Sequence, residues 1–192
     1  MKRLHIVAAL IALTSHSVMA ETLPGAPSFH EGLAIVEVDG RIGYINKAGE
    51  WMIPPLFGEG EPFSEGLAAV KAGAVWGYID STGGFQIEPR FESAGAFQSS
   101  LAPVKMKGKW GYINHKGKFE IKARFIQAFA FRGGFARVVQ SREKVGFIKP
   151  NGRYLVKPRY ESASDFSSGM AAVKHDGKWG FINDEGDEVI EP

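Results

Sequence analysis

Apolar and polar positions recur along the chain in three short runs, shown by "GLAAVKAG" (66–73), "VWGYI" (75–79) and "FQIEPRF" (85–91). Runs of this length with a period of two, rich in valine and aromatic residues, are typical of β-strands. In the middle run, alternation puts Trp76 and Tyr78 on one face and Gly77 and Ile79 on the other. Both faces are apolar, so this run is predicted to be the central strand of a small sheet.

The pattern returns at a fixed period. The glycine of the central strand occurs at 43, 77, 111, 146 and 180, at spacings of 34, 34, 35 and 34 residues. A fixed period in this range indicates a repeat architecture. We therefore divide the chain into the repeats 29–62, 63–96, 97–130, 131–165 and 166–192. Glycine in a strand interior predicts a close approach by a neighbouring ring or backbone.

A tight turn follows the central strand. Asn46, Asp80, Asn114 and Asn183 begin it, with Lys149 in the fourth repeat, and a glycine follows three residues later in all five repeats. An Asx residue followed by glycine is typical of such turns. The third strand is predicted to end at a proline, at Pro55, Pro89, Pro158 and Pro192. Each repeat is therefore expected to be a three-stranded antiparallel meander.

These units resemble the bacterial WG (KWG) repeat, on the strength of "FSEGLAAVK" (63–71) and "GKWGYI" (108–113) and their in-phase copies over residues 29–192. The resemblance implies a β-rich repeat protein, often exported, with no settled catalytic activity and no catalytic residues. Repeats one and four carry Ile42 and Val145 where the pattern has tryptophan. This departure argues against a ligand site built from a uniform tryptophan ladder.

We predict an all-β open array of five three-stranded antiparallel meander repeats, with a small β-propeller as the alternative. The chain starts at a first strand and stops at a third strand, so no repeat is shared between the two termini in the manner that closes many propellers. Glu188 stands where the other repeats have an aromatic residue. A charged side chain there suits a terminal repeat that has one face in water.

The first twenty residues predict export. Lys2 and Arg3 precede an apolar run at 4–13, and small residues follow at Val18 and Ala20. This order is that of a signal peptide, cleaved here after Ala20, and the run is too short to span a bilayer. Residues 21–28 then form a short linker. The mature chain is expected to be periplasmic or secreted, with no transmembrane span.

The sequence favours no enzyme class and predicts no catalytic, cofactor-binding or metal-binding residues. The chain has no P-loop, nucleophile elbow or dinucleotide fingerprint, and its histidines occupy unrelated positions. The alternative function is an envelope carbohydrate-binding or hydrolytic module that uses aromatic rings and carboxylates such as Glu59, Glu61 and Glu65. Core packing is the simpler role for the recurring aromatic residues.

Charge is distributed unevenly along the chain. Residues 21–100 carry 11 acidic and 4 basic side chains, residues 101–160 carry 2 and 15, and residues 161–192 carry 8 and 2. A basic middle of +13 between acidic ends is expected to attract anionic partners. Lysines in turns and at sheet edges also discourage aggregation, so both roles remain open for single residues.

The sequence therefore predicts an exported, non-catalytic interaction scaffold without a cofactor. Its expected partners are a protein with an acidic surface or an anionic envelope polysaccharide; nucleic acid is not expected, and head-to-tail self-association would also fit. The predicted contact residues are Lys105, Lys107, Lys109, Lys116, Lys118, Arg132, Arg137, Arg142 and Lys144.

Overall fold

The computed structural model describes residues 28–142 and 144–192, which form strands and turns without a helix. Within these ranges no helix is long and apolar enough to cross a membrane. The predicted signal peptide and all of the predicted linker except Ser28 lie outside the described residues.

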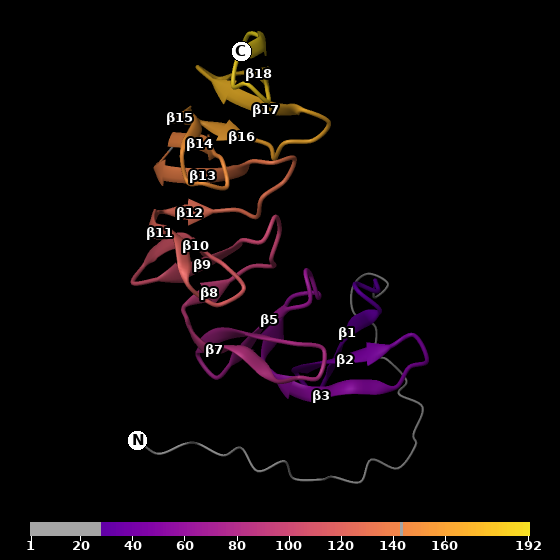
Figure 1. Ribbon diagram of the computed structural model, residues 1–192. Helices are drawn as coiled ribbons and strands as arrows, with labels where there is room; N and C mark the ends of the chain where they lie inside the picture. The colour runs from indigo at the N-terminus through magenta and orange to yellow at the C-terminus, as the bar shows by residue number, and fades with distance from the viewer. Residues whose placement is uncertain (1–27, 143) are drawn as a thin grey trace.

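The strands form five antiparallel sheets that follow one another along the chain (Figure 1). The first sheet contains β1 (Leu33–Val38), β2 (Arg41–Asn46) and β3 (Trp51–Phe57). The second contains β4 (Glu59–Gly60), β5 (Ala68–Ala72), β6 (Val75–Ile79) and β7 (Phe85–Phe91). The third contains β8 (Ser93–Ala94), β9 (Ala102–Met106), β10 (Lys109–Ile113) and β11 (Phe119–Phe125). The fourth contains β12 (Gln127–Ala128), β13 (Ala136–Ser141), β14 (Lys144–Ile148) and β15 (Tyr154–Tyr160). The fifth contains β16 (Ser162–Ala163), β17 (Met170–His175), β18 (Lys178–Asn183) and β19 (Glu188–Ile190).

The predicted three-strand meander is confirmed in all five sheets, with the Trp-Gly strand between its two neighbours. The sequence did not predict the two-residue strand that opens sheets two to five. In the second sheet this strand pairs Glu59 with Lys71 and Gly60 with Val70. The connection between repeats therefore belongs to the sheet that follows it, and each of these sheets begins a few residues before the repeat boundary drawn from the sequence.

The prediction that the third strand ends at its proline is wrong for β3, β7 and β15, which continue for two residues beyond Pro55, Pro89 and Pro158. In the fifth repeat β19 ends at Ile190, before Pro192. In β7 the strand continues through Pro89 to Phe91, which pairs with Trp76. The residues between Ile87 and Phe91 form a bulge, and a bulge tolerates a proline because its N–H is not needed for the sheet ladder. A Cβ atom at Gly77 would lie 2.7 Å from the Ile87 carbonyl oxygen, so the bulge requires glycine at this position.

Four apolar cores lie between consecutive sheets. Between the second and third sheets, Trp76, Tyr78 and Phe91 pack with Val104 and Ile113. The same positions form the other three cores, each shared by one sheet and the next. The tryptophan and tyrosine face of each sheet therefore points to the following sheet, and the glycine and isoleucine face points to the preceding one.

The array is open. The five sheets follow a curved path, and the first and last sheets lie at opposite ends of the described chain (Figure 1). Glu188 is exposed, as the sequence suggested for a terminal repeat, but it lies on the side of the fifth sheet that faces the preceding sheet. Its carboxylate contacts Arg159 (2.9 Å) and the Tyr160 hydroxyl (3.0 Å) of the preceding sheet. The outward face of the fifth sheet instead exposes Trp179, Phe181 and Ile190.

Candidate binding surface

The basic side chains of repeats three and four lie at both ends of the strands. Because β10 is antiparallel to its neighbours, Lys109 pairs with Met106 at one end, and Ile113 pairs with Phe119 at the other. We call the first end, with the β9–β10 and β13–β14 hairpins, the hairpin face. We call the second end, with the β10–β11 and β14–β15 turns, the turn face. A five-residue strand separates the two faces by about 15 Å.

The hairpin face holds five of the nine predicted contact residues. They share exposed or half-buried positions at the tips of two hairpins: Lys105, Lys107, Lys109, Arg142 and Lys144. An acidic residue lies among them, since the Glu92 carboxylate accepts a hydrogen bond from the Gly108 N–H at 3.1 Å. This contact lowers the net positive charge of the β9–β10 hairpin.

The turn face holds the other four predicted residues, Lys116, Lys118, Arg132 and Arg137. Lys116 and Lys118 lie in the turn after β10, and their backbone N–H groups donate to the Asn114 Oδ1 atom. Their side chains are not needed for this turn and are exposed. The nine residues therefore form two groups at opposite ends of the strands, which a small ligand would contact separately.

Arg132 and Arg137 converge on Asp165, which the sequence did not single out. The Arg137 Nε atom lies 3.1 Å from Asp165 Oδ1, and the Arg132 Nε atom lies 3.7 Å from Asp165 Oδ2. The Arg137 guanidinium also stacks 3.7 Å from the centroid of the Phe129 ring. Arg137 is thus held in the structure on two sides, whereas 63% of the Arg132 side chain is exposed and can contact a ligand.

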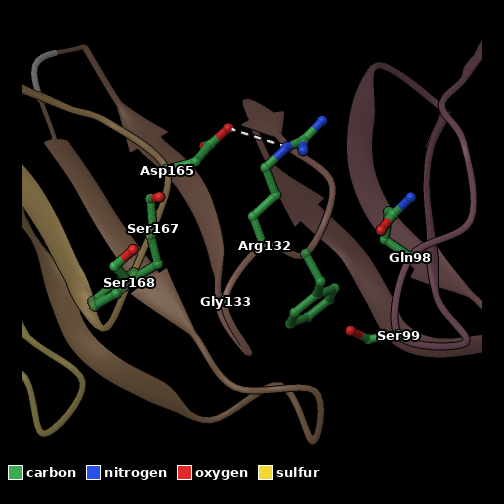
Figure 2. Close-up of a pocket in the computed structure, with 9 residues that line it drawn as sticks. Gln98, Ser99, Arg132, Gly133, Asp165, Ser167 and Ser168 are labelled. Carbon is green, nitrogen blue, oxygen red and sulfur yellow. Dashed lines mark ion pairs between the residues drawn. The ribbon is translucent and has the colours of Figure 1, made fainter.

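An open hollow of about 510 Å³ lies beside Arg132. Figure 2 shows Arg132 between the turn that carries Gln98 and Ser99 and the segment that carries Asp165, with Ser167 and Ser168 on the far side. The lining is polar apart from Phe131 and Phe166. The hollow therefore spans three successive repeats and is largely polar, with Arg132 and Asp165 as the charged side chains of its lining.

A second set of arginines has a structural role that sequence reasoning missed. Arg90 donates to the Gly117 carbonyl at 2.7 Å, and Arg124 donates to the Gly152 carbonyl at 3.0 Å. Each arginine precedes the aromatic residue that ends its third strand and tethers the turn of the next repeat. The recurrence of Arg-Phe and Arg-Tyr at the end of the third strand could have indicated this role. These arginines hold consecutive sheets together.

The residues proposed for carbohydrate binding or hydrolysis have structural contacts. Trp76 is buried and Trp51 and Trp110 are half-buried, so of the four tryptophans only Trp179 is exposed. Glu59 pairs with Lys71 on the neighbouring strand, and Glu65 contacts the backbone of the next repeat. Burial raises the pKa of the Glu61 carboxyl. Across the described residues no group of three or more histidine or acidic side chains is placed to hold a metal ion.

The arrangement of three- and four-stranded antiparallel sheets stacked face to face defines a β-repeat protein related to propeller-type folds. The chain belongs to the family described as WG containing repeat, whose sequence model matches residues 42–74, 76–110, 110–141, 146–179 and 179–192. No curated protein matches the chain in sequence.

Two solved structures are similar in fold. Hsv2p of Kluyveromyces lactis superposes with a TM-score of 0.56 at 11% identity, over 85% of this chain and 61% of that one. BamB of Moraxella catarrhalis superposes with a TM-score of 0.53 at 10% identity, over 86% of this chain and 62% of that one. The chain thus spans about three fifths of the length of these structures, and the likeness concerns the fold alone.

Proposed function

We propose that the chain is an exported, non-catalytic interaction scaffold that binds an anionic partner through the basic side chains of repeats three and four. The partner is an acidic protein surface or an anionic polysaccharide of the envelope. One observation carries the proposal: the excess of 13 positive charges in residues 101–160 falls on two adjacent sheets, largely at exposed strand ends. Such a concentration of one sign steers oppositely charged partners toward these sheets.

Several features support a scaffold. The propeller-type stacking of repeats presents successive turns side by side, which gives an extended surface. The hollow on the turn face is shallow and shared by three repeats. Export is supported by the order of charged, apolar and small residues in the first twenty positions.

Binding to defined polyanions tests the proposal. The full mature chain, residues 21–192, is expected to bind poly-glutamate or polygalacturonate at low ionic strength and to lose most of this binding at about 0.5 M salt, where charges are screened within a few ångströms. Two triple variants separate the faces. Lys107→Glu, Lys109→Glu and Lys144→Glu reverse the hairpin face, and Lys116→Glu, Lys118→Glu and Arg132→Glu reverse the turn face.

A matched control reverses Lys47 and Lys178, which are exposed outside repeats three and four. We expect at least one triple variant to lose the polyanion while the control keeps it. Equal binding by all variants, or binding that salt does not weaken, would contradict the proposal. Binding to a neutral glycan instead would favour the carbohydrate-binding alternative.

A further inference from the structure

A column of five identical tight turns runs along the turn face. Each turn joins the opening segment of a repeat to its first long strand, and the turns are centred on residues 31–32, 65–66, 99–100, 133–134 and 168–169. Both central residues have positive φ in every case, for example 54° at Glu65 and 81° at Gly66, as in type I′ turns. The N–H groups of the two central residues point away from the turn's own hydrogen bonds and are available to other partners.

In the second and third turns a carboxylate of the preceding repeat takes one of these donors. The Gly66 N–H donates to Glu31 Oε2 at 2.9 Å, and the Ser100 N–H donates to Glu65 Oε2 at 3.0 Å. The spacing in sequence is 35 residues in both contacts. Glu65 also lies 3.3 Å from His115 Nε2, whose ring stacks on Phe97. The chain thus contains its own example of a glutamate bound to the next turn.

The series of carboxylates stops after Glu65. The next two positions hold Ser99 and Gly133, which carry no carboxylate. The donors that they would serve are the N–H groups of Gly134 and Gly169. Both glycines are exposed, and no group among the described residues accepts a hydrogen bond from either N–H. The fourth and fifth turns of the column therefore present the same N–H donor with no acceptor among the described residues.

The hollow occupies the place of the missing side chains. Its lining includes Ser99, Gly133 and Ser168, which are the equivalents of Glu65 in the last three turns. Gly133 cannot easily take a longer side chain, because a Cβ atom there would lie 3.0 Å from the Phe166 Cβ. Arg132, in the same turn as Gly134, adds a positive charge that Asp165 only partly offsets at 3.7 Å. A carboxylate in the hollow would meet Arg132 and lie close to the turn donors, because Gly134 and Gly169 directly follow the lining residues Gly133 and Ser168.

We infer that the hollow binds an acidic peptide segment whose carboxylates occupy the Gly134 and Gly169 N–H groups, in the manner of Glu31 and Glu65. This inference rests on the proposed function and names the anionic partner as a polypeptide, because the bound group that the chain itself displays is a glutamate side chain. Packed sheets lie about 10 Å apart. In a polyproline II segment, residues three apart lie on the same side of the chain and span about 9 Å. The fitting ligand therefore has acidic residues at positions i and i+3.

Glycine amide resonances give a direct readout. The full chain, labelled with 15N, is titrated with a short extended peptide that has glutamates at i and i+3, and with its glutamine counterpart. We expect the amide signals of Gly134 and Gly169 to move downfield with the acidic peptide and to stay in place with the glutamine peptide. The signal of Gly66 should stay in place with both, because Glu31 already occupies its donor.

The variant Ser99→Glu restores the missing carboxylate. Ser99 has φ 55° and Glu65 has φ 54°, so the turn accommodates glutamate. Ser99 and Gly134 are separated by 35 residues in sequence, as are Glu65 and Ser100. The Gly134 signal should then lie downfield without ligand and no longer respond, and peptide affinity should fall about tenfold, as expected for loss of one charge-assisted hydrogen bond. Ser99→Gln controls for size. Gln127→Glu adds the same charge on strand β12, outside the hollow, and should leave the affinity within about twofold.

The outcomes separate this inference from the proposed function. A peptide that binds without moving Gly134 or Gly169, and is displaced by reversing the hairpin face, would overturn the inference and leave the proposed function standing. Polygalacturonate that binds at these glycines more tightly than the peptide would overturn the assignment to a polypeptide. Absence of binding by every anion would overturn both.

Discussion

The second and fifth repeats share one sequence pattern but differ in what their side chains do. Trp76 of the second repeat is 8% exposed between two sheets, whereas Trp179 at the same position of the fifth repeat is 54% exposed. Tyr78 is buried and donates to the carbonyl of Gly95, which directly follows β8 of the next sheet, whereas its counterpart Phe181 is 40% exposed. The role of a repeated residue therefore depends on whether another sheet packs on its face.

The polar groups of the tight turns also differ in role between repeats that share one pattern. Glu65 of the second repeat reaches the Ser100 N–H of the third, whereas Ser168 of the fifth repeat is exposed beside the hollow. In the second and third repeats an N–H group of this turn donates to a glutamate of the preceding repeat. In the fourth and fifth repeats the equivalent N–H group has no acceptor among the described residues. Substitutions at matched positions of two repeats test this difference between covered and uncovered repeats.

The largest difference is expected for the two tryptophans. Trp76→Ala removes a buried ring from the core between the second and third sheets and should lower the free energy of unfolding by about 3 to 5 kcal/mol. Trp179→Ala removes a mostly exposed ring and should cost about 1 kcal/mol or less. Urea denaturation measures both values. Equal losses would show that the outward face of the fifth sheet is covered in solution.

A smaller effect is expected from the glycine under the bulge. Gly77→Ala places a Cβ atom 2.7 Å from a backbone carbonyl and should cost about 2 kcal/mol through strain in β7. Gly58→Ala is the control, since a Cβ atom there meets nothing within 4 Å. Thermal unfolding of both variants checks the difference. An unperturbed melting temperature for Gly77→Ala would mean that the bulge does not press on this strand.

Removing an internal carboxylate should have a still smaller effect. Glu65→Ala breaks the contacts with the Ser100 N–H and His115 and should cost about 1 kcal/mol, because the group is partly exposed. Ser168→Ala removes a side chain that makes no such contact among the residues that the structure describes, and it should be neutral within about 0.5 kcal/mol. Denaturation at matched ionic strength measures both. A neutral Glu65→Ala would indicate that the carboxylate does not stabilise the next turn.

The smallest effect concerns acid stability. The pKa of Asp80 is lowered by hydrogen bonds from the Thr82 hydroxyl and from backbone N–H groups of its turn. A lowered pKa means that this stabilisation is present above the unfolded-state value and is lost as the pH falls through the folded-state value.

Asn183 accepts the equivalent backbone bonds in the fifth repeat without a titratable group. Asp80→Asn should therefore keep the turn and weaken the loss of stability in acid, and Asn183→Asp should strengthen it. Melting temperatures measured from pH 7 to pH 3 check both changes. Identical pH profiles for wild type and both variants would contradict this assignment.

The sequence predicted much of the fold because each strand carries its own local pattern. The period fixed the number of sheets, and the alternation of Trp76 and Tyr78 with Gly77 and Ile79 assigned the two faces correctly. The two-residue strand at Glu59 was missed because it is too short to carry an apolar pattern. Pro89 was misread as a strand end because the bulge that contains it depends on close packing against Gly77 of the neighbouring strand, which only the structure shows.

The binding surface was harder to predict. The basic segment of the chain was visible as a charge imbalance, but its division between two faces depends on strand direction. Asp165 did not stand out because its partners Arg132 and Arg137 lie about one repeat away in sequence. The open N–H donors at Gly134 and Gly169 could not be predicted from either glycine alone, because they depend on the absence of a carboxylate in the preceding turn.

Amide hydrogen exchange at three glycines tests the central comparison most directly. Gly66, Gly134 and Gly169 occupy the same position of the same turn, and only Gly66 has a carboxylate acceptor among the described residues. We expect the Gly66 amide to exchange about tenfold more slowly than those of Gly134 and Gly169 in the free chain, which corresponds to one hydrogen bond. Equal exchange rates at the three glycines would contradict the account of occupied and open turns.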